Sequence, residues 1–144
     1  MDYFRATAIS AAGMAAEKAR VEAATLNLAN MNTSAAPGAP GFRPVTAIIH
    51  AERTLFARAF QGGSQPMTLA RATVVPQTGI TTRMAFEPGH PDADADGMVA
   101  YPAVDSTQEM MTVMTALRAY EANLAALQAT KTLAARALEI GSNS

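Results

Sequence analysis

The fold is decided by the stretch from Ser106 to Gly141, which reads STQEMMTVMTALRAYEANLAALQATKTLAARALEIG. Neither proline nor glycine interrupts it before Gly141, so it predicts one continuous helix of roughly 50 Å. The spacing of Ser106 and Glu109 predicts a capping box, in which each side chain accepts a bond from a free amide. Gly141 is expected to end the helix in the left-handed conformation. A helix this long is difficult to cover with one compact domain.

Two apolar seams run along this helix at the alternating spacing of three and four residues that is typical of coiled coils. The first seam consists of Met110, Val113, Leu117, Tyr120, Leu124, Leu127, Lys131, Ala134 and Leu138. The second lies one residue back, about 100° round the helix, and consists of Ala116, Ala119, Asn123, Ala126, Thr130, Leu133, Ala137 and Ile140. One partner helix cannot cover both seams, so several neighbours are expected. The pattern leaves open whether they belong to this chain or to others.

Residues 3–32 predict a second long helix whose seam is built mostly of small residues. The seam consists of Ile9, Ala12, Ala16, Ala19, Ala23, Leu26 and Asn30. Small residues allow close approach, so we expect this seam to pack against the Leu/Met seam of the C-terminal helix, in either direction. Gly13 costs about 1 kcal/mol in a helix interior, so the helix is expected to fray alone and to order on assembly. Asn30 and Asn123 lie in seams, where a buried amide fixes register; alternatively, both amides reach solvent.

The middle of the chain changes character and predicts β-structure. Short runs with β-branched residues occur at Phe42–His50, Met67–Val75 and Ile80–Phe86, separated by turn-forming residues. Residues 52–60 are ambiguous between strand and short helix, and residues 88–102 are expected to form a loop.

The predicted fold class is therefore mainly α with a small β insert. Long N- and C-terminal helices pair as a coiled-coil-like rod, and the middle segment forms β-hairpins. We divide the chain into an N-terminal helix (1–33), a loop and β insert (34–104) and a C-terminal helix (105–144).

Composition excludes several classes of function. The net charge of −1 gives no basic field for nucleic acid, and the absence of cysteine removes disulfide and thiolate chemistry. The first residues, Met1 to Arg5, lack the features of a cleaved secretory signal, so any export is expected to use another route. Charged residues are scarce, at 16%, which favours surfaces that are buried by association.

One acidic loop resembles the first half of a calcium-binding loop. Asp92, Asp94, Asp96 and Gly97 match positions 1, 3, 5 and 6 of an EF-hand, but position 12 is Ala103, which offers no side-chain oxygen. We therefore favour aspartates that cap their own turn, with a calcium-regulated binding protein as an alternative.

No catalytic constellation is visible in the sequence. His50 and His90 are the only histidines, and neither has a ligand spacing around it. No nucleophile–base pair or phosphate-binding glycine loop can be identified. We expect no enzyme activity, no cofactor and no metal.

The residues resemble a known family at both ends of the chain. Asn27-Leu28-Ala29-Asn30, followed by Thr33, resembles the N-terminal signature of flagellar rod and hook proteins. The loop Phe86–Gly97, read with Val99 and Pro102, is similar to that of one proximal-rod member.

In the C-terminal helix, the similarity to that member extends over Glu109, Met110, Arg118, Ala119, Tyr120, Glu121, Ala122, Asn123, Lys131, Ile140 and Gly141. The chain departs from the family pattern at Met98, Ala103 and Glu121, and residues 34–85 show no match. The resemblance covers about half the chain.

This resemblance implies a non-enzymatic structural subunit of the bacterial flagellar basal body, located in the periplasmic rod. It implies that the terminal helices form the inner tube and that the chain leaves the cytoplasm through the flagellar type III export apparatus, without a cleavable signal. The implied partners are other rod subunits, further copies of the chain, the rod-base adaptor and the membrane ring. No nucleic acid and no small-molecule substrate are implied.

The seams and the signature together predict the residues of the assembly interface. They are Leu26, Asn27, Leu28, Ala29, Asn30, Thr33, Met110, Leu117, Arg118, Tyr120, Asn123, Leu124, Leu127, Lys131 and Leu138. The alternative is a free-standing coiled-coil adaptor that forms a small, discrete oligomer through the same residues.

Overall fold

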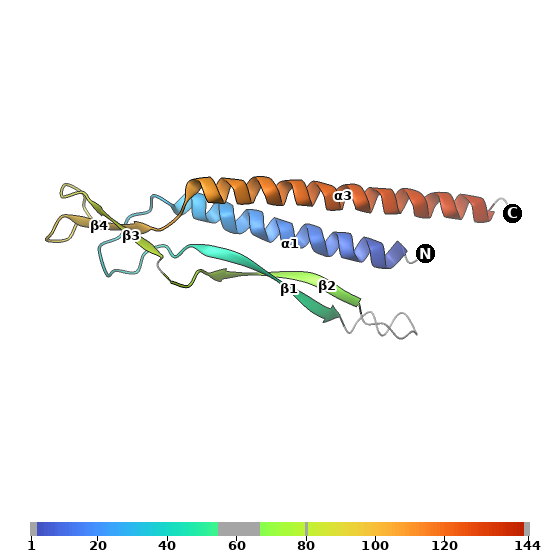
Figure 1. Cartoon of the computed structure of the whole chain (residues 1–144), viewed down its shortest axis with the longest axis horizontal. Helices are drawn as coiled ribbons and strands as arrows, with labels where there is room; N and C mark the ends of the chain where they lie inside the picture. Colours follow the sequence, from blue (N-terminus) through green and yellow to red (C-terminus); the bar gives the residue numbers. More distant parts are fainter. Residues whose placement is uncertain (1–2, 55–66, 80, 143–144) are drawn as a thin grey trace. The chain divides into compact units, whose positions relative to one another are not determined.

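The computed structural model describes residues 3–54, 67–79 and 81–142. Along the chain the elements are α1 (Tyr3–Asn30), β1 (Val45–Thr54), β2 (Met67–Pro76), β3 (Thr82–Phe86), β4 (Met98–Pro102) and α3 (Ser106–Ser142) (Figure 1). The strands form two two-stranded antiparallel sheets, β1 with β2 and β3 with β4. Two terminal helices around small sheets confirm the predicted mainly α class with a β insert.

The three predicted strands occur close to their expected positions, as β1, β2 and β3, but β4 was not predicted. The expected loop at 88–102 is wrong at its end, because β4 pairs in register with β3. Its residues Val99 and Ala100 are buried, and this burial stabilises a strand that is only five residues long. In the ambiguous region, residues 52–54 belong to β1, whereas 55–60 lie outside the described residues, as does residue 80.

The start of α3 is capped by a different residue from the one expected. The Asp105 carboxylate accepts hydrogen bonds from the backbone amides of Thr107 (2.9 Å) and Gln108 (3.2 Å). The predicted capping box is therefore wrong: Asp105, not Ser106, is the N-cap. An aspartate is favoured here because its negative charge also interacts with the positive end of the helix dipole.

The predicted end of α3 at Gly141 is also wrong. The helix continues through Ser142, and the glycines with positive φ are Gly38, Gly79 and Gly97. Gly141 therefore sits in helical conformation, where a glycine weakens the last turn.

The chain divides into two compact units, and both long helices contribute to each. The first unit comprises residues 1–19, 49–73 and 115–144, and the second comprises residues 20–48 and 74–114. In the first unit, Ala16 of α1 and Ala116 of α3 are buried. An ion pair joins the two strands of this unit, since Arg71 of β2 lies 3.0 Å from the carboxylate of Glu52 in β1.

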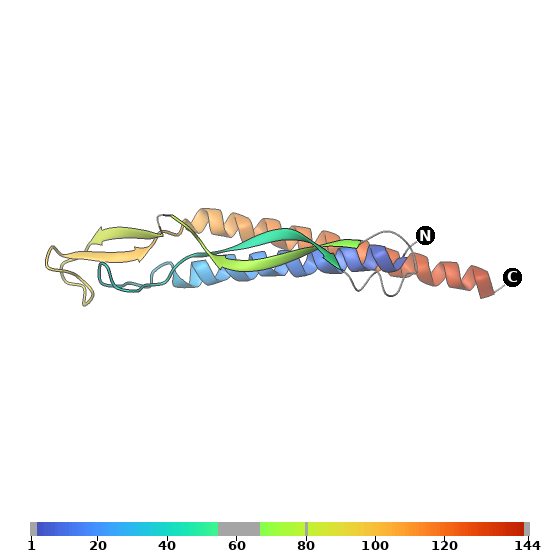
Figure 2. The same ribbon diagram turned by 90° about the horizontal axis from the view of Figure 1, so that it is seen from below.

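The core of the second unit is built from small side chains and one buried strand. Its buried apolar side chains include Ala23, Ala24, Pro44, Val99, Ala100 and Pro102. In Figure 2, β3 and β4 lie side by side as an antiparallel hairpin. Ala35 adds an isolated antiparallel bridge to Ala100, with both backbone hydrogen bonds formed (2.9 and 3.0 Å).

The acidic loop joins β3 to β4 and is stabilised by its own side chains. The Asp94 carboxylate accepts bonds from the amides of Asp96 (3.0 Å) and Met98 (2.8 Å). Gly97 follows with φ of +74°, a conformation that favours glycine. The prediction that an aspartate caps its own turn is confirmed for Asp94. Asp92 instead accepts a bond from the Ser34 hydroxyl at 2.6 Å.

Candidate assembly site

Asn27 is the best-buried polar side chain of the second unit, with 1% of its surface exposed. Its amide nitrogen donates to the carbonyl oxygen of Val45, and its amide oxygen accepts the Val45 backbone N–H, each at 2.8 Å. The side chain thereby pairs with Val45 as the backbone of a neighbouring strand would. The first residue of β1 is held against α1 by this pairing.

Glu109 completes this arrangement from α3. Its carboxylate accepts a bond from the Asn27 amide nitrogen at 3.0 Å. We call the set Asn27, Val45 and Glu109 the Asn27 clamp, because it joins α1, β1 and α3 through three hydrogen bonds. A buried amide with both ends satisfied stabilises one arrangement of these elements.

The seam pattern predicts Asn30 as a register-setting amide, whereas Asn27 belongs to the predicted interface through the family signature. Asn27 lies three and four residues beyond Ala24 and Ala23, so it continues the buried stripe of α1. That spacing is the sequence signal for its burial. Its partners Val45 and Glu109 carry no such signal, because they lie in distant segments.

Asn30 makes local contacts. Its amide nitrogen donates to the Leu26 carbonyl of its own helix at 2.9 Å, in an exposed position. The Thr33 backbone amide donates to the Asn30 carbonyl at 3.0 Å, and the Thr33 hydroxyl lies 3.5 Å from the Asn30 side-chain oxygen. These residues close the end of α1.

Asn123 lies where α1 and α3 approach closely in the first unit. A Cβ atom added to Gly13 would lie only 2.8 Å from its side-chain oxygen. Asn123 also donates to the Ala119 carbonyl of its own helix at 2.9 Å. Glycine at position 13 is unfavourable in an isolated helix, but here it allows the close approach of Asn123.

The seam of α3 that meets α1 differs from the one expected. Ala116, of the second seam, has no exposed surface, whereas Leu117, one residue further, is 46% exposed. Met110, Leu117 and Leu138 of the Leu/Met seam are exposed, so within one chain these three residues do not form the expected packing on the N-terminal helix. The contact with Gly13 is made by Asn123, also of the second seam.

Five large apolar side chains of the Leu/Met seam, and Met114 beside them, are instead exposed to solvent. We call these residues the α3 apolar face: Met110, Met114, Leu117, Tyr120, Leu124 and Leu138. Of the other predicted interface residues, Leu26, Ala29, Thr33, Arg118 and Lys131 are exposed, and Leu28 and Leu127 are half-buried. Several large apolar side chains exposed on one side of a helix favour an interaction site.

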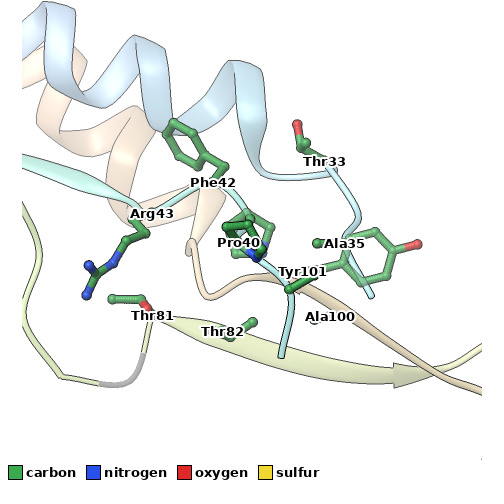
Figure 3. Close-up of a pocket in the computed structure, with 12 residues that line it drawn as sticks. Thr33, Ala35, Pro40, Phe42, Arg43, Thr81, Thr82, Ala100 and Tyr101 are labelled. Atoms are coloured by element: carbon green, nitrogen blue, oxygen red, sulfur yellow. The ribbon is translucent and has the colours of Figure 1, made fainter. Parts of the chain in front are cut away.

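A cavity of about 310 Å³ lies in the second unit, between the loop after α1 and the β3–β4 hairpin. Figure 3 shows Arg43 at one side of it and Tyr101 with Thr33 at the other. Partial burial, the 3.0 Å hydrogen bond to Glu87 and the charge of Glu87 raise the pKa of Tyr101 above its ordinary value. The walls hold no nucleophile–base pair.

The described residues also contain no group of three or more His, Asp or Glu side chains arranged to hold a metal ion. Among the helices of the described ranges, none combines the length and apolar character needed to cross a bilayer. The features that stand out are thus the α3 apolar face and the Asn27 clamp.

Comparison with known proteins identifies the class to which these features belong. A family model described as "Flagellar basal body rod FlgEFG protein C-terminal" matches residues 95–140, which include β4 and nearly all of α3. The chain thus carries the C-terminal region of flagellar basal-body rod proteins.

The relatives specify the family further. The chain is 32% identical to flagellar basal-body rod protein FlgC of Aquifex aeolicus, over 96% of this chain and 97% of the relative. It is 31% identical to FlgC of Yersinia enterocolitica (92% and 93%) and 29% identical to FlgC of Bacillus subtilis (98% and 99%). The chain belongs to the FlgC family of flagellar basal-body rod proteins, which are structural and not enzymatic.

Proposed function

We propose that this chain is a structural subunit of the flagellar basal-body rod, which polymerises through its terminal helices and transmits torque from the motor to the hook. The observation that carries the proposal is the α3 apolar face, exposed on a chain of the rod family. Its six large side chains are covered when neighbouring subunits pack against them, and their burial supplies the association energy. The other predicted interface residues lie elsewhere on α3, on α1 or, for Thr33, just after α1.

Within the subunit, α1 and α3 pair as an antiparallel, coiled-coil-like rod. Two contacts support this pairing. Gly13 lies against Asn123 in the first unit, and Asn27 bonds Glu109 in the second. From the first contact to the second, the contacting residue on α1 lies later in the chain and the contacting residue on α3 lies earlier by the same number of residues. Antiparallel helices require this order. Residues 1–33 and 105–144 then form the rod core, and 34–104 form the outer insert.

Torque transmission follows from the way the subunits join. A face of one copy that meets a different face of the next generates an open helical filament. Within each subunit the Asn27 clamp fixes β1 to both helices of the second unit, so the insert follows the core when the rod turns.

The same proposal names the partners and the route. The chain joins other rod subunits and copies of itself, meets the rod-base adaptor at one end, and is surrounded by the membrane ring. It reaches the periplasmic rod through the flagellar export apparatus.

The proposal is tested by an in-frame deletion and its complementation. Cells that lack the chain are expected to be non-motile and without hooks, and a plasmid copy is expected to restore both. Motility is scored in soft agar, and hooks by immunofluorescence of intact cells. Normal swimming of the deletion strain would refute the proposed function.

A further inference from the structure

The β3–β4 hairpin has one strand edge with no partner among the described residues. Backbone bonds join Glu87 to Gly97 and Ala103 to Thr81, at the two ends of the ladder. Hydrogen-bonded pairs alternate along an antiparallel ladder, so the odd-numbered residues of β3 bond to β4. The N–H and C=O groups of Thr82, Met84 and Phe86 therefore point outward.

The other edge of the hairpin is closed, which makes the open edge of β3 distinctive. Ala35 bridges to Ala100 on the far side of β4, and the backbone N–H of Asp94 donates to the Met98 carbonyl at 3.0 Å. The chain thus covers the outer edge of β4 with its own backbone, and leaves that of β3 uncovered in the described part of the chain.

The open edge also lacks the usual protection against pairing. Natural edge strands carry outward charges, prolines or bulges that prevent association. On β3 the outward positions hold Thr82, Met84 and Phe86, and the last two side chains are 49% and 69% exposed. The nearby charges are engaged elsewhere: Arg83 lies 4.8 Å from the centre of the Tyr101 ring, and Glu87 bonds the Tyr101 hydroxyl.

We propose that the open edge of β3 pairs with an extended segment of a second copy of this chain. The chain itself carries suitable segments, since β1 and β2 form a separate two-stranded sheet, and in the described part of the chain no further strand pairs with either outer edge. At the start of β1 the backbone of Val45 is bonded to the Asn27 side chain, so the edge of β1 that is open begins after Val45. Ile48, Ile49 and Val74 on these strands are exposed apolar residues, which suits them to pack against the apolar side chains of Met84 and Phe86. Pairing two β3 edges would close a dimer, whereas pairing β3 with β1 or β2 continues along a filament.

This inference rests on the proposed function and is tested by photocrosslinking in cells. The crosslinking residue p-benzoylphenylalanine replaces Phe86, and the irradiated adduct is identified by its mass and by peptide sequencing. We expect an adduct of twice the 15.0 kDa chain mass, joined to a peptide from β1 or β2. An adduct to another protein, or no adduct in motile cells, would overturn the inference and leave the rod function standing.

Two variants at one position separate backbone pairing from side-chain contact. Met84→Pro removes one outward N–H without touching a bond to β4, as edge positions allow. It is expected to reduce the adduct about fivefold or more. Met84→Ala keeps the N–H and is expected to retain most of the adduct. Equal loss in both variants would mean that the contact is apolar packing and not strand pairing.

Discussion

At the scale of single residues, Asn27 is the side chain on which the second unit depends most. Asn27→Asp keeps the shape but removes both N–H donors, and it places a second carboxylate beside Glu109. We expect a loss of about 3 kcal/mol in unfolding free energy, because the Val45 carbonyl is left unpaired and the two carboxylates repel. Urea denaturation followed by circular dichroism measures it.

Asn30 supplies the matched control for this substitution. It lies on the same helix and in the same signature, but its side chain makes only local, exposed bonds, to the Leu26 carbonyl and from the Thr33 hydroxyl. Asn30→Asp is expected to change stability by less than about 1 kcal/mol. Equal effects at the two positions would contradict the role assigned to the Asn27 clamp.

Gly97 tests the turn that joins β3 to β4. Its φ is +74°, and an added Cβ would lie 2.9 Å from the Phe86 ring. Gly97→Ala is expected to destabilise the chain by about 2 kcal/mol. Gly89→Ala in the same loop, where no atom lies within 4 Å, is expected to be nearly neutral, and urea midpoints compare the two.

The raised pKa of Tyr101 predicts a loss of stability at alkaline pH. Its pKa is raised above 10.0 in the folded chain, so the unfolded chain releases the phenolic proton first as the pH rises. The contribution of Tyr101 is complete below pH 10.0 and is lost as the pH rises through its folded pKa. Unfolding free energies across this range are expected to fall more steeply in the natural chain than in Tyr101→Phe. Parallel curves would contradict the raised pKa.

What the sequence revealed at this scale depended on how local the interaction is. Asp94 capping its own turn was predictable, because the bonds reach two and four residues along the chain. The bonds of the Asn27 clamp join residues that are 18 and 82 positions apart, and no periodicity in the sequence predicts such distant partners. Asp105 was missed because Ser106 matched the capping-box pattern one residue later.

At the scale of elements, the approach of α1 to α3 in the first unit is set by Gly13 and Asn123. Gly13→Ala removes a helix defect worth about 1 kcal/mol, yet its Cβ would force Asn123 to rotate and lose its bond to Ala119. We therefore expect Gly13→Ala to be destabilising by about 1 kcal/mol.

The same substitution is expected to change sign when Asn123 is removed. In the Asn123→Ala background the three atoms that lie nearest the added methyl group are removed, so Gly13→Ala should stabilise by about 1 kcal/mol. A double-mutant cycle of urea unfolding free energies measures this coupling. Simple additivity of the two substitutions would show that the helices do not meet at these residues.

Helices and most strands could be predicted because their signals are periodic and local. Both seams of α3 could be identified in the sequence. Which of the two packs against α1 could not be predicted, because the Ala and Leu seams are equally apolar by pattern. Only packing distinguishes them: small side chains at Ala116 and Gly13 let the helices approach, which turns Leu117 outward. The strand β4 was missed because its five residues are flanked by turn-forming residues on both sides.

At the scale of the whole molecule, the α3 apolar face should matter for assembly and not for the isolated chain. Leu124 is 36% exposed, so Leu124→Asp is expected to leave export of the chain intact. It should abolish swimming, because assembly would bury an unpaired charge. Soft-agar motility and immunoblots of the secreted fraction measure the two effects.

Ala122 provides the control. It is also exposed, but it lies about 160° round the helix from Leu124, outside the α3 apolar face. A strain that carries Ala122→Asp is expected to swim nearly as well as the parent strain. If the strain that carries Leu124→Asp swims equally well, the α3 apolar face is not the assembly surface.

The most direct test of the rod function is electron microscopy of basal bodies purified from a strain that lacks this chain. We predict membrane rings without a completed rod and without a hook, restored by expression of the natural chain. Intact basal bodies with rods and hooks in the deletion strain would contradict the assignment of this chain to the rod.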